Sequence, residues 1–440
     1  MKTQSNHRWQ SLPARLSLGV LCLALAGMAF GQETKPVDAP VTREEYNNVV
    51  RELAAIKQKL GLIEEQKTAQ AKETEETFSD YDKQLKAIKS LATTAQPGNT
   101  KMLFTGWADV GFADRKGAPS TFNASFNPIV LWKLSDRLFF EGELEFEVDN
   151  RVTATSLEYA NVSYIANDYL TLKAGRFLTP FGTYGEKLHP GWINKLPDAP
   201  LPFGHTGIAP TSSLGVQASG GFPAGSAKFN YAVYVSNGPR LNMGVGEPGE
   251  AGLLHFDNNP DNNGNKAVGA RIGFLPIPEL ELGYSFKSAK VGQGVDATAL
   301  LQAVDLNYVR DSKPLKGVID VKGQWVWSKV SDVIYDTGGG PFTFNNRRNG
   351  GYLQLAYRPS RLEDTFIQNL ESVVRWDKIS NPSGAPEETS FVEKRWTIGL
   401  NYWLGASTAI KVAYQFGDRT TPGSGKETPS AFLLQTAMGF

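Results

Sequence analysis

The chain has 440 residues, with 45 lysines and arginines against 45 aspartates and glutamates, and Cys22 is its single cysteine. Balanced charge argues against nucleic acid as a partner, because neutralising phosphates requires a clear basic excess. One cysteine excludes disulfide frameworks and paired-cysteine metal or haem sites.

Residues 1–31 have the pattern of a secretory signal peptide. The basic residues Lys2, Arg8 and Arg15 precede the apolar run 16–30. Ala29 and Gly31 supply small residues at positions −3 and −1 of a cleavage site. A lipoprotein signal at Cys22 is disfavoured, because Leu21 stands where lipidation requires a small residue. We therefore expect cleavage after Gly31 and a mature chain without cysteine.

Residues 32–41 form a proline-containing linker, and residues 42–96 are predicted to form a helix. Thr42 and Glu45 have the spacing of a capping box at its start. Apolar residues then recur three and four positions apart, at Tyr46, Val49, Leu53, Ile56, Leu60 and Ile63. This spacing predicts a coiled coil. The alternative is an amphipathic helix that lies on the rest of its own chain.

The hydrophobic period changes to two in residues 100–440, where apolar and small or polar residues alternate. We predict 16 strands at 103–113, 122–133, 137–149, 155–165, 168–178, 212–220, 226–237, 266–275, 279–289, 298–310, 315–329, 350–358, 368–378, 394–404, 408–417 and 430–440. Most have about the ten residues that a tilted membrane strand requires.

The connections between these strands alternate in length. Tight turns stand at 134–136, 166–168, 276–278 and 405–407, whereas the loops 179–211, 238–265, 330–349, 379–393 and 418–429 are long. Short periplasmic turns and long external loops are typical of outer-membrane barrels. We therefore predict an all-β membrane protein, a 16-stranded antiparallel barrel with the N-terminal helix in the periplasm. A soluble β-sandwich is disfavoured, because it rarely needs so many strands.

The last predicted strand carries apolar residues on one face. Phe432, Leu434, Met438 and Phe440 share that face with Thr436. Phe440 resembles the terminal aromatic that outer-membrane barrels present to the barrel-assembly machinery. We expect that machinery to be a partner of this chain.

Three segments are similar to motifs of the phosphate-selective porin (O/P type) superfamily. They are GRFLTPFG at 175–182, LGVQASG at 214–220 and NYAVYVSNG at 230–238. The resemblance implies a trimeric 16-stranded porin with an inward-folded third loop. In some members of the family, a periplasmic coiled coil precedes the barrel.

The third loop, 179–211, is the candidate constriction. Its charged and titratable residues are Glu186, Lys187, His189, Lys195, Asp198 and His205, and it contains no arginine. The family's phosphate selection resembles a ladder of arginines, which suits phosphate because guanidinium groups bind its oxygens in a fixed fork. We therefore expect a loop that folds inward, stiffened by six prolines, without phosphate specificity.

Charged residues on the alternating strands are predicted to face the lumen, because charges at mid-membrane on the lipid face are costly. The acidic set is Glu141, Glu143, Glu145 and Glu147, and the basic set is Arg271, Lys287, Lys322, Arg358, Arg375, Arg395 and Lys411. An acidic wall would then face a basic wall, with a slight preference for cations. The alternative is that these charges pair across strands and hydrate a pore.

Nothing in the sequence indicates catalysis or a cofactor. The mature chain would keep only His189, His205 and His255, each in a long loop and without the spacing of a metal site. The stretch 257–265 resembles a calcium-binding loop but lacks the terminal glutamate, so we interpret it as a solvated loop. We expect no enzyme activity, no cofactor and no bound metal.

The sequence therefore predicts an outer-membrane porin of a Gram-negative-type bacterium. It would be a homotrimer embedded in lipid, with a water-filled channel for passive diffusion of small hydrophilic solutes or ions. One alternative is a structural anchor that links the outer membrane to the cell wall through the coiled coil. The other is the barrel component of an electron-transfer conduit, with haem supplied by partner proteins.

Overall fold

The computed structural model describes Lys57 and residues 101–440, except 150–151, 205–206 and 257–262. The chain divides into two units, 1–98 and 99–440. The predicted signal peptide, linker and coiled coil therefore lie outside the described residues, apart from Lys57, which is helical. Among the residues that the structure describes, no helix is both long and apolar enough to cross a membrane.

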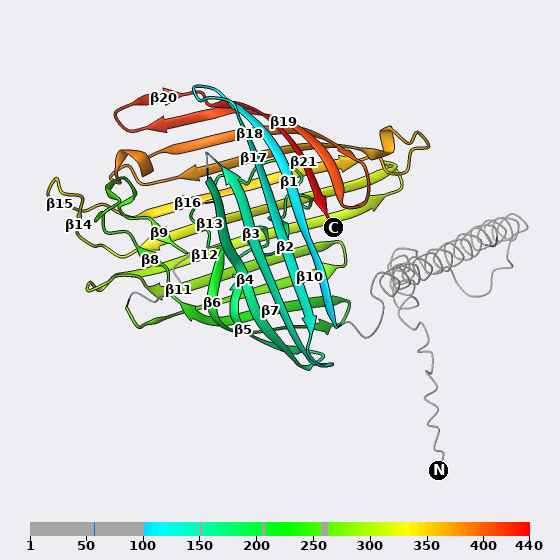
Figure 1. Cartoon of the computed structure of the whole chain (residues 1–440), viewed down its shortest axis with the longest axis horizontal. Coiled ribbons are helices and arrows are strands. Elements are labelled where there is room, and N and C mark those ends of the chain that lie inside the picture. Colours follow the sequence, from blue (N-terminus) through cyan, green and yellow to red (C-terminus); the bar gives the residue numbers. More distant parts are fainter. Residues whose placement is uncertain (1–56, 58–100, 150–151, 205–206, 257–262) are drawn as a thin grey trace, which may run out of the picture. The chain divides into compact units, whose positions relative to one another are not determined.

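The strands of the second unit form one large antiparallel sheet with short additions (Figure 1). The long strands are β1 (Met102–Arg115), β2 (Thr121–Lys133), β3 (Leu138–Asp149), β4 (Val152–Asn167), β5 (Leu170–Leu178), β6 (Ser212–Ala224), β7 (Ala227–Asn237), β10 (Lys266–Ile277), β11 (Leu280–Lys290), β12 (Thr298–Ser312), β13 (Gly317–Val330), β16 (Arg347–Arg358), β17 (Leu370–Ser380), β18 (Val392–Trp403), β19 (Thr408–Thr421) and β21 (Ser430–Gly439). The short ones are β8 (Arg240–Leu241), β9 (Leu254–His255), β14 (Tyr335–Asp336), β15 (Pro341–Phe342) and β20 (Gly425–Glu427).

The long strands close into a barrel. Each pairs antiparallel with the next long strand along the chain, and β21 returns to pair with β1, from Trp107↔Gly439 to Arg115↔Ala431. Closure leaves no free edge, which is what a sheet needs in order to span a membrane. The predicted fold, a closed 16-stranded antiparallel barrel, is confirmed.

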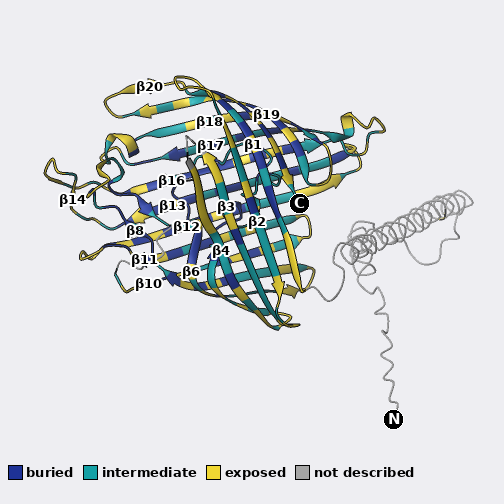
Figure 2. Cartoon of the chain, viewed as in Figure 1, coloured by how far each residue is buried: buried dark blue, intermediate teal, exposed yellow. Residues whose placement is uncertain are grey.

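The outer surface of the barrel is apolar, and its interior is polar. Along β18, Ile398 and Leu400 are 55% and 49% exposed on the outside, whereas Thr397 and Asn401, which flank them, are fully buried. The same alternation runs along other strands (Figure 2). It follows from the two-residue period of a strand, which sends successive side chains to opposite faces.

The connections differ between the two ends of the barrel, as the sequence predicts. Tight turns such as 225–226 and 278–279 join strands at one end, and long loops join them at the other. The β8–β9 and β14–β15 hairpins and β20 belong to these long loops and gather at the left end in Figure 1.

The interior core is built around the loop 179–211, between β5 and β6. Phe181 and Ile208 of this loop are 1% and 3% exposed and cluster with apolar side chains of β12 and β13, among them Leu301 and Val326. Leu196, also 1% exposed, packs in a second cluster with residues of β16, β17, β19 and β21. The loop thus crosses the barrel from the wall where it begins to the opposite wall.

Candidate functional site

The first part of the loop is hydrogen-bonded to β11 and β13. The backbone N–H of Gly182 donates to Ser285 Oγ at 3.0 Å. Gln324 Oε1 accepts the backbone N–H groups of Thr183 and Tyr184 at 3.0 and 3.1 Å. These bonds satisfy backbone groups that would otherwise be buried without partners.

The middle of the loop lies against β18 and β19. The fully buried Lys411 donates from Nζ to the carbonyl oxygens of Gly191 and Asn194, the latter at 2.6 Å. Nearby, Leu196 packs on Gly399, where an added Cβ would stand only 2.5 Å from the leucine methyl group. The glycine therefore allows the loop to approach the barrel wall closely.

An ion pair follows at Lys195. Its Nζ lies 2.6 Å from Glu371 Oε1 on β17 and 5.1 Å from the ring centre of Trp403. Glu371 Oε2 accepts from Asn401 Nδ2 and from Trp403 Nε1, both at 3.1 Å. This network fixes the loop's lysine to the wall, so its charge is already balanced.

A second network holds Asp198. Its Oδ1 lies 2.8 Å from Arg375 Nη2, and its Oδ2 lies 3.0 Å from Arg395 Nη2 and 2.7 Å from Gln415 Nε2. Burial by itself would raise the pKa of Asp198, but the two guanidinium groups lower it, so the carboxylate stays ionised. Both arginines also pair with Asp377, at 3.0 and 2.9 Å.

The remaining predicted basic residues are also engaged, two of them with acids and two with neutral polar groups. Arg271 lies 2.6 Å from Asp305 and 2.9 Å from Glu281, and Lys322 lies 2.6 Å from Asp320. Lys287 donates to Ser213 Oγ at 3.0 Å, and Arg358 donates to Asn369 Oδ1 at 2.7 Å. Arg271 and Lys322 are thus balanced by acids of neighbouring positions, whereas Lys287 and Arg358 are held by neutral groups.

The four glutamates predicted to line the pore differ in their surroundings. Glu141 pairs with Lys173 at 2.8 Å, and Glu143 is 2% exposed and accepts from Trp107 Nε1 at 2.8 Å. Glu145 is half-buried and accepts from Ser156 Oγ at 3.1 Å, and Glu147 is exposed. Only Glu143, Glu145 and Glu147 line the cavity described next.

A cavity of about 580 Å³ remains between the loop and the walls formed by β1 to β5. Its acidic lining residues are Asp109, Glu143, Glu145, Glu147, Glu158 and Asp198, and its one guanidinium is Arg176. Loop residues such as Pro197 and Phe203 form the other side. The cavity lining therefore has more carboxyl groups than basic groups, although Asp198 is already paired with Arg375 and Arg395.

Glu158 is a lining residue that the alternating pattern does not reveal. The register between β3 and β4 shifts after Glu143↔Tyr159, and the next pair is Leu144↔Leu157. The bulged residue between them is Glu158, which joins Glu145 in the cavity. The two-residue alternation of the sequence cannot predict that Glu158 faces the cavity, because the bulge depends on how β3 pairs with β4.

The other predicted loop residues are placed as follows. Lys187 Nζ lies 3.5 Å from Glu281 Oε2, and burial raises the pKa of Glu186. His189 packs edge-on against Trp107, and burial lowers its pKa to about 4, so the imidazole is neutral at pH 7. His205 lies outside the described residues.

Phe440 takes part in closing the barrel. Its backbone N–H donates to Gly106 O at 3.0 Å, and its ring stacks on Phe126 with centroids 5.7 Å apart. Phe104 lies 6.3 Å away on the same outer surface. The terminal aromatic is thus part of an aromatic group that spans the seam between the first and last strands. Its predicted role as an assembly signal stays a prediction.

These features define a closed 16-stranded antiparallel barrel with a loop that folds inward. No protein-family model matches the chain, and no curated protein matches it.

Solved structures do match in fold. The outer membrane channel DcaP of Acinetobacter baumannii is 12% identical, with a TM-score of 0.51 over 77% of this chain and 97% of that one. OmpF of Salmonella typhi, solved in complex with daunomycin, is 13% identical, with a TM-score of 0.51 over 78% and 98%. OprB of Pseudomonas putida is 9% identical, with a TM-score of 0.50 over 77% and 94%.

Proposed function

We propose that this protein is an outer-membrane porin through which small hydrophilic solutes or ions diffuse passively. The observation that carries the proposal is the acidic cavity of about 580 Å³ between the inward loop and the walls of a closed barrel. The apolar outer surface suits lipid, and the charged inner surface suits water. The fold shared with DcaP, OmpF and OprB supports the same function.

The loop 179–211 would set the width of the passage. It is anchored to the opposite wall by Lys195, Asp198 and the carbonyl groups that Lys411 binds. Deleting residues 186–206 should raise single-channel conductance several-fold in planar bilayers. An unchanged conductance would show that the loop does not limit the passage, and a protein that conducts no ions would favour the structural anchor instead.

The pore should prefer cations weakly. Glu145, Glu147 and Glu158 line the cavity, whereas Arg375 and Arg395 are bound to acids. Carboxylates along a passage raise the local concentration of cations. The reversal potential in a salt gradient measures this preference, which should vanish near 1 M salt, where the Debye length is about 3 Å.

Phosphate specificity is not part of the proposal, although residues 175–182 resemble the O/P-type signature. The third loop has no arginine, and the guanidinium groups of Arg375 and Arg395 that reach it bind Asp198 and Asp377. Phosphate would have to displace those carboxylates. A chloride current that phosphate blocks at low concentration would overturn this view.

The predicted trimer and its periplasmic coiled coil complete the proposal. The apolar spacing from Tyr46 to Ile63 supports a stalk of associated helices. Mass analysis of the protein in detergent should show three chains per particle.

A further inference from the structure

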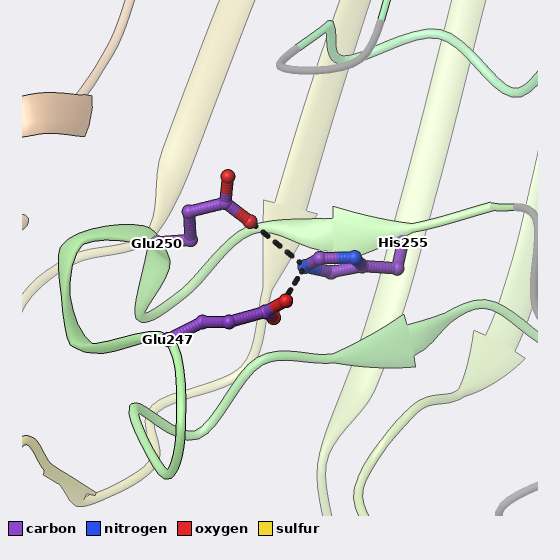
Figure 3. Close-up of side chains that lie close together, drawn as sticks. All are labelled: Glu247, Glu250 and His255. Carbon is purple, nitrogen blue, oxygen red and sulfur yellow. Dashed lines mark ion pairs between the residues drawn. The ribbon is translucent and has the colours of Figure 1, made fainter. Parts of the chain in front are cut away.

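Three side chains of the long loop 238–265 lie close together (Figure 3). The group does not include the glutamates of β3 that line the cavity. The three residues are Glu247, Glu250 at the end of the short helix η2 (Pro248–Glu250), and His255 on β9. One ligand atom from each lies within 4.8 Å of the others. Among the described residues, this is the single group of three or more His, Cys, Asp or Glu side chains that meets so closely.

The distance between His255 and Glu250 is close to that between two ligands of one metal ion, and Glu247 lies slightly farther away. His255 Nε2 lies 3.3 Å from Glu250 Oε2 and 3.9 Å from Glu247 Oε2. Ligands about 2.1 Å from a tetrahedral zinc ion are about 3.4 Å apart. A divalent ion between these atoms would also neutralise two carboxylates that otherwise repel each other.

The surrounding structure holds the side chain of Glu247 and the backbone of His255 in place. β9 pairs with β8 through Arg240↔His255 and Leu241↔Leu254. Asn242, which is 1% exposed, donates from Nδ2 to Glu247 Oε2 at 3.1 Å. Such a bond to a ligand carboxylate fixes its orientation, as partners of metal ligands commonly do.

Two further hydrogen bonds connect the loop 238–265 to other loops at the same end of the barrel. Asn346 Nδ2 donates to the carbonyl oxygen of Gly252 at 2.7 Å, and Thr389 Oγ1 donates to that of Gly249 at 3.4 Å. The segment between Glu250 and His255 is buried, with Ala251 at 0% and Leu253 at 5% exposure. The carboxylates and the imidazole therefore do not need a large rearrangement to share an ion.

We propose that Glu247, Glu250 and His255 bind a divalent transition-metal ion of the zinc class at the loop end of the barrel. An imidazole nitrogen with two carboxylate oxygens suits zinc, whereas calcium prefers oxygen ligands alone. His255 also lines the acidic cavity, together with Phe256. A bound ion would leave the site close to neutral, because its two charges balance the two carboxylates, and it would keep one coordination position for water or a solute at the edge of the passage.

The experiment measures zinc binding to the full mature protein without a histidine tag, by titration calorimetry in detergent. The wild type should bind one Zn²⁺ per chain, and His255→Gln and Glu250→Gln should each weaken binding by more than about tenfold. Asp296→Asn is the matched control, because Asp296 is an exposed loop carboxylate paired with Lys290. It should leave the affinity unchanged.

X-ray absorption at the zinc edge of the wild type supplies a test that needs no variant. It should show nitrogen and oxygen ligands at about 2.0–2.2 Å, with imidazole scattering. The proposal fails if the wild type binds no zinc, if His255→Gln binds it as tightly, or if the spectrum shows only oxygen ligands. Zinc binding does not depend on conduction, so this outcome is separate from that of the proposed porin function.

Discussion

Arg375 on β17 and Asp198 in the inward loop form an ion pair between residues 177 positions apart in the sequence, with Nη2 and Oδ1 at 2.8 Å. The arginine side chain is fully buried and that of the aspartate is 17% exposed. The pair joins the third loop to the wall opposite the strands that carry it. The loop's position therefore depends on buried charge as well as on apolar packing.

Replacing Asp198 by alanine should free this part of the loop. Arg375 and Arg395 would each lose one of two carboxylate partners and would share Asp377, so we expect a cost below the about 3–5 kcal/mol of breaking a buried pair outright. We expect a higher and noisier single-channel conductance and a lower melting temperature. Asp311→Ala is the control, because the Asp311–Arg361 pair is 2.6 Å long but about half exposed. Equal effects of the two variants would contradict a special role for Asp198.

Replacing Glu145 and Glu147 together by glutamine should shift the reversal potential towards anions. Both line the cavity, and removing their charge lowers the local concentration of cations. Glu141→Gln should shift it less, because Glu141 is not part of the cavity lining. The measurement is the reversal potential in a salt gradient at low ionic strength. A larger shift in the Glu141 variant would show that the passage follows a different wall.

Replacing Phe440 by alanine should weaken closure of the barrel. Its ring stacks on Phe126 across the seam, and an aromatic pair contributes about 0.5–1.5 kcal/mol beyond its buried area. We expect a lower yield of folded barrel and a lower temperature of the heat-induced shift in gel migration. Phe416→Ala is the control, because Phe416 is 41% exposed on β19 against 43% for Phe440. If both variants fold with the same yield and shift at the same temperature, the Phe440 ring does not contribute specifically to closure between β1 and β21.

Deleting residues 32–96 should reduce the resistance of the oligomer to heat in detergent. The apolar spacing from Tyr46 to Ile63 predicts that these helices associate. The measurement is the temperature at which the oligomer dissociates in gels. Unchanged dissociation would show that the barrels alone hold the oligomer, and the single-channel conductance should be the same with or without the segment.

The alternating pattern determined the number of strands, their approximate positions and the face that each side chain takes. These are local properties, because a strand's period of two is fixed by its own backbone. The pattern alone therefore assigns Lys411 and Arg375 to the interior. Asp377 and Glu371 have the same phase as Arg375, so the sequence already contained the acids that balance the late strands.

The tertiary structure decided which charges meet and which remain open to the passage. Asp198 reaches Arg375 only because the barrel closes and the loop crosses it, so no local pattern predicts the pair. Glu158 enters the cavity through a bulge that depends on the pairing of β3 with β4. His255 meets Glu250 because β8 and β9 fold the long loop back on itself. Contacts between distant residues depend on closure and register, and these are properties of the whole sheet.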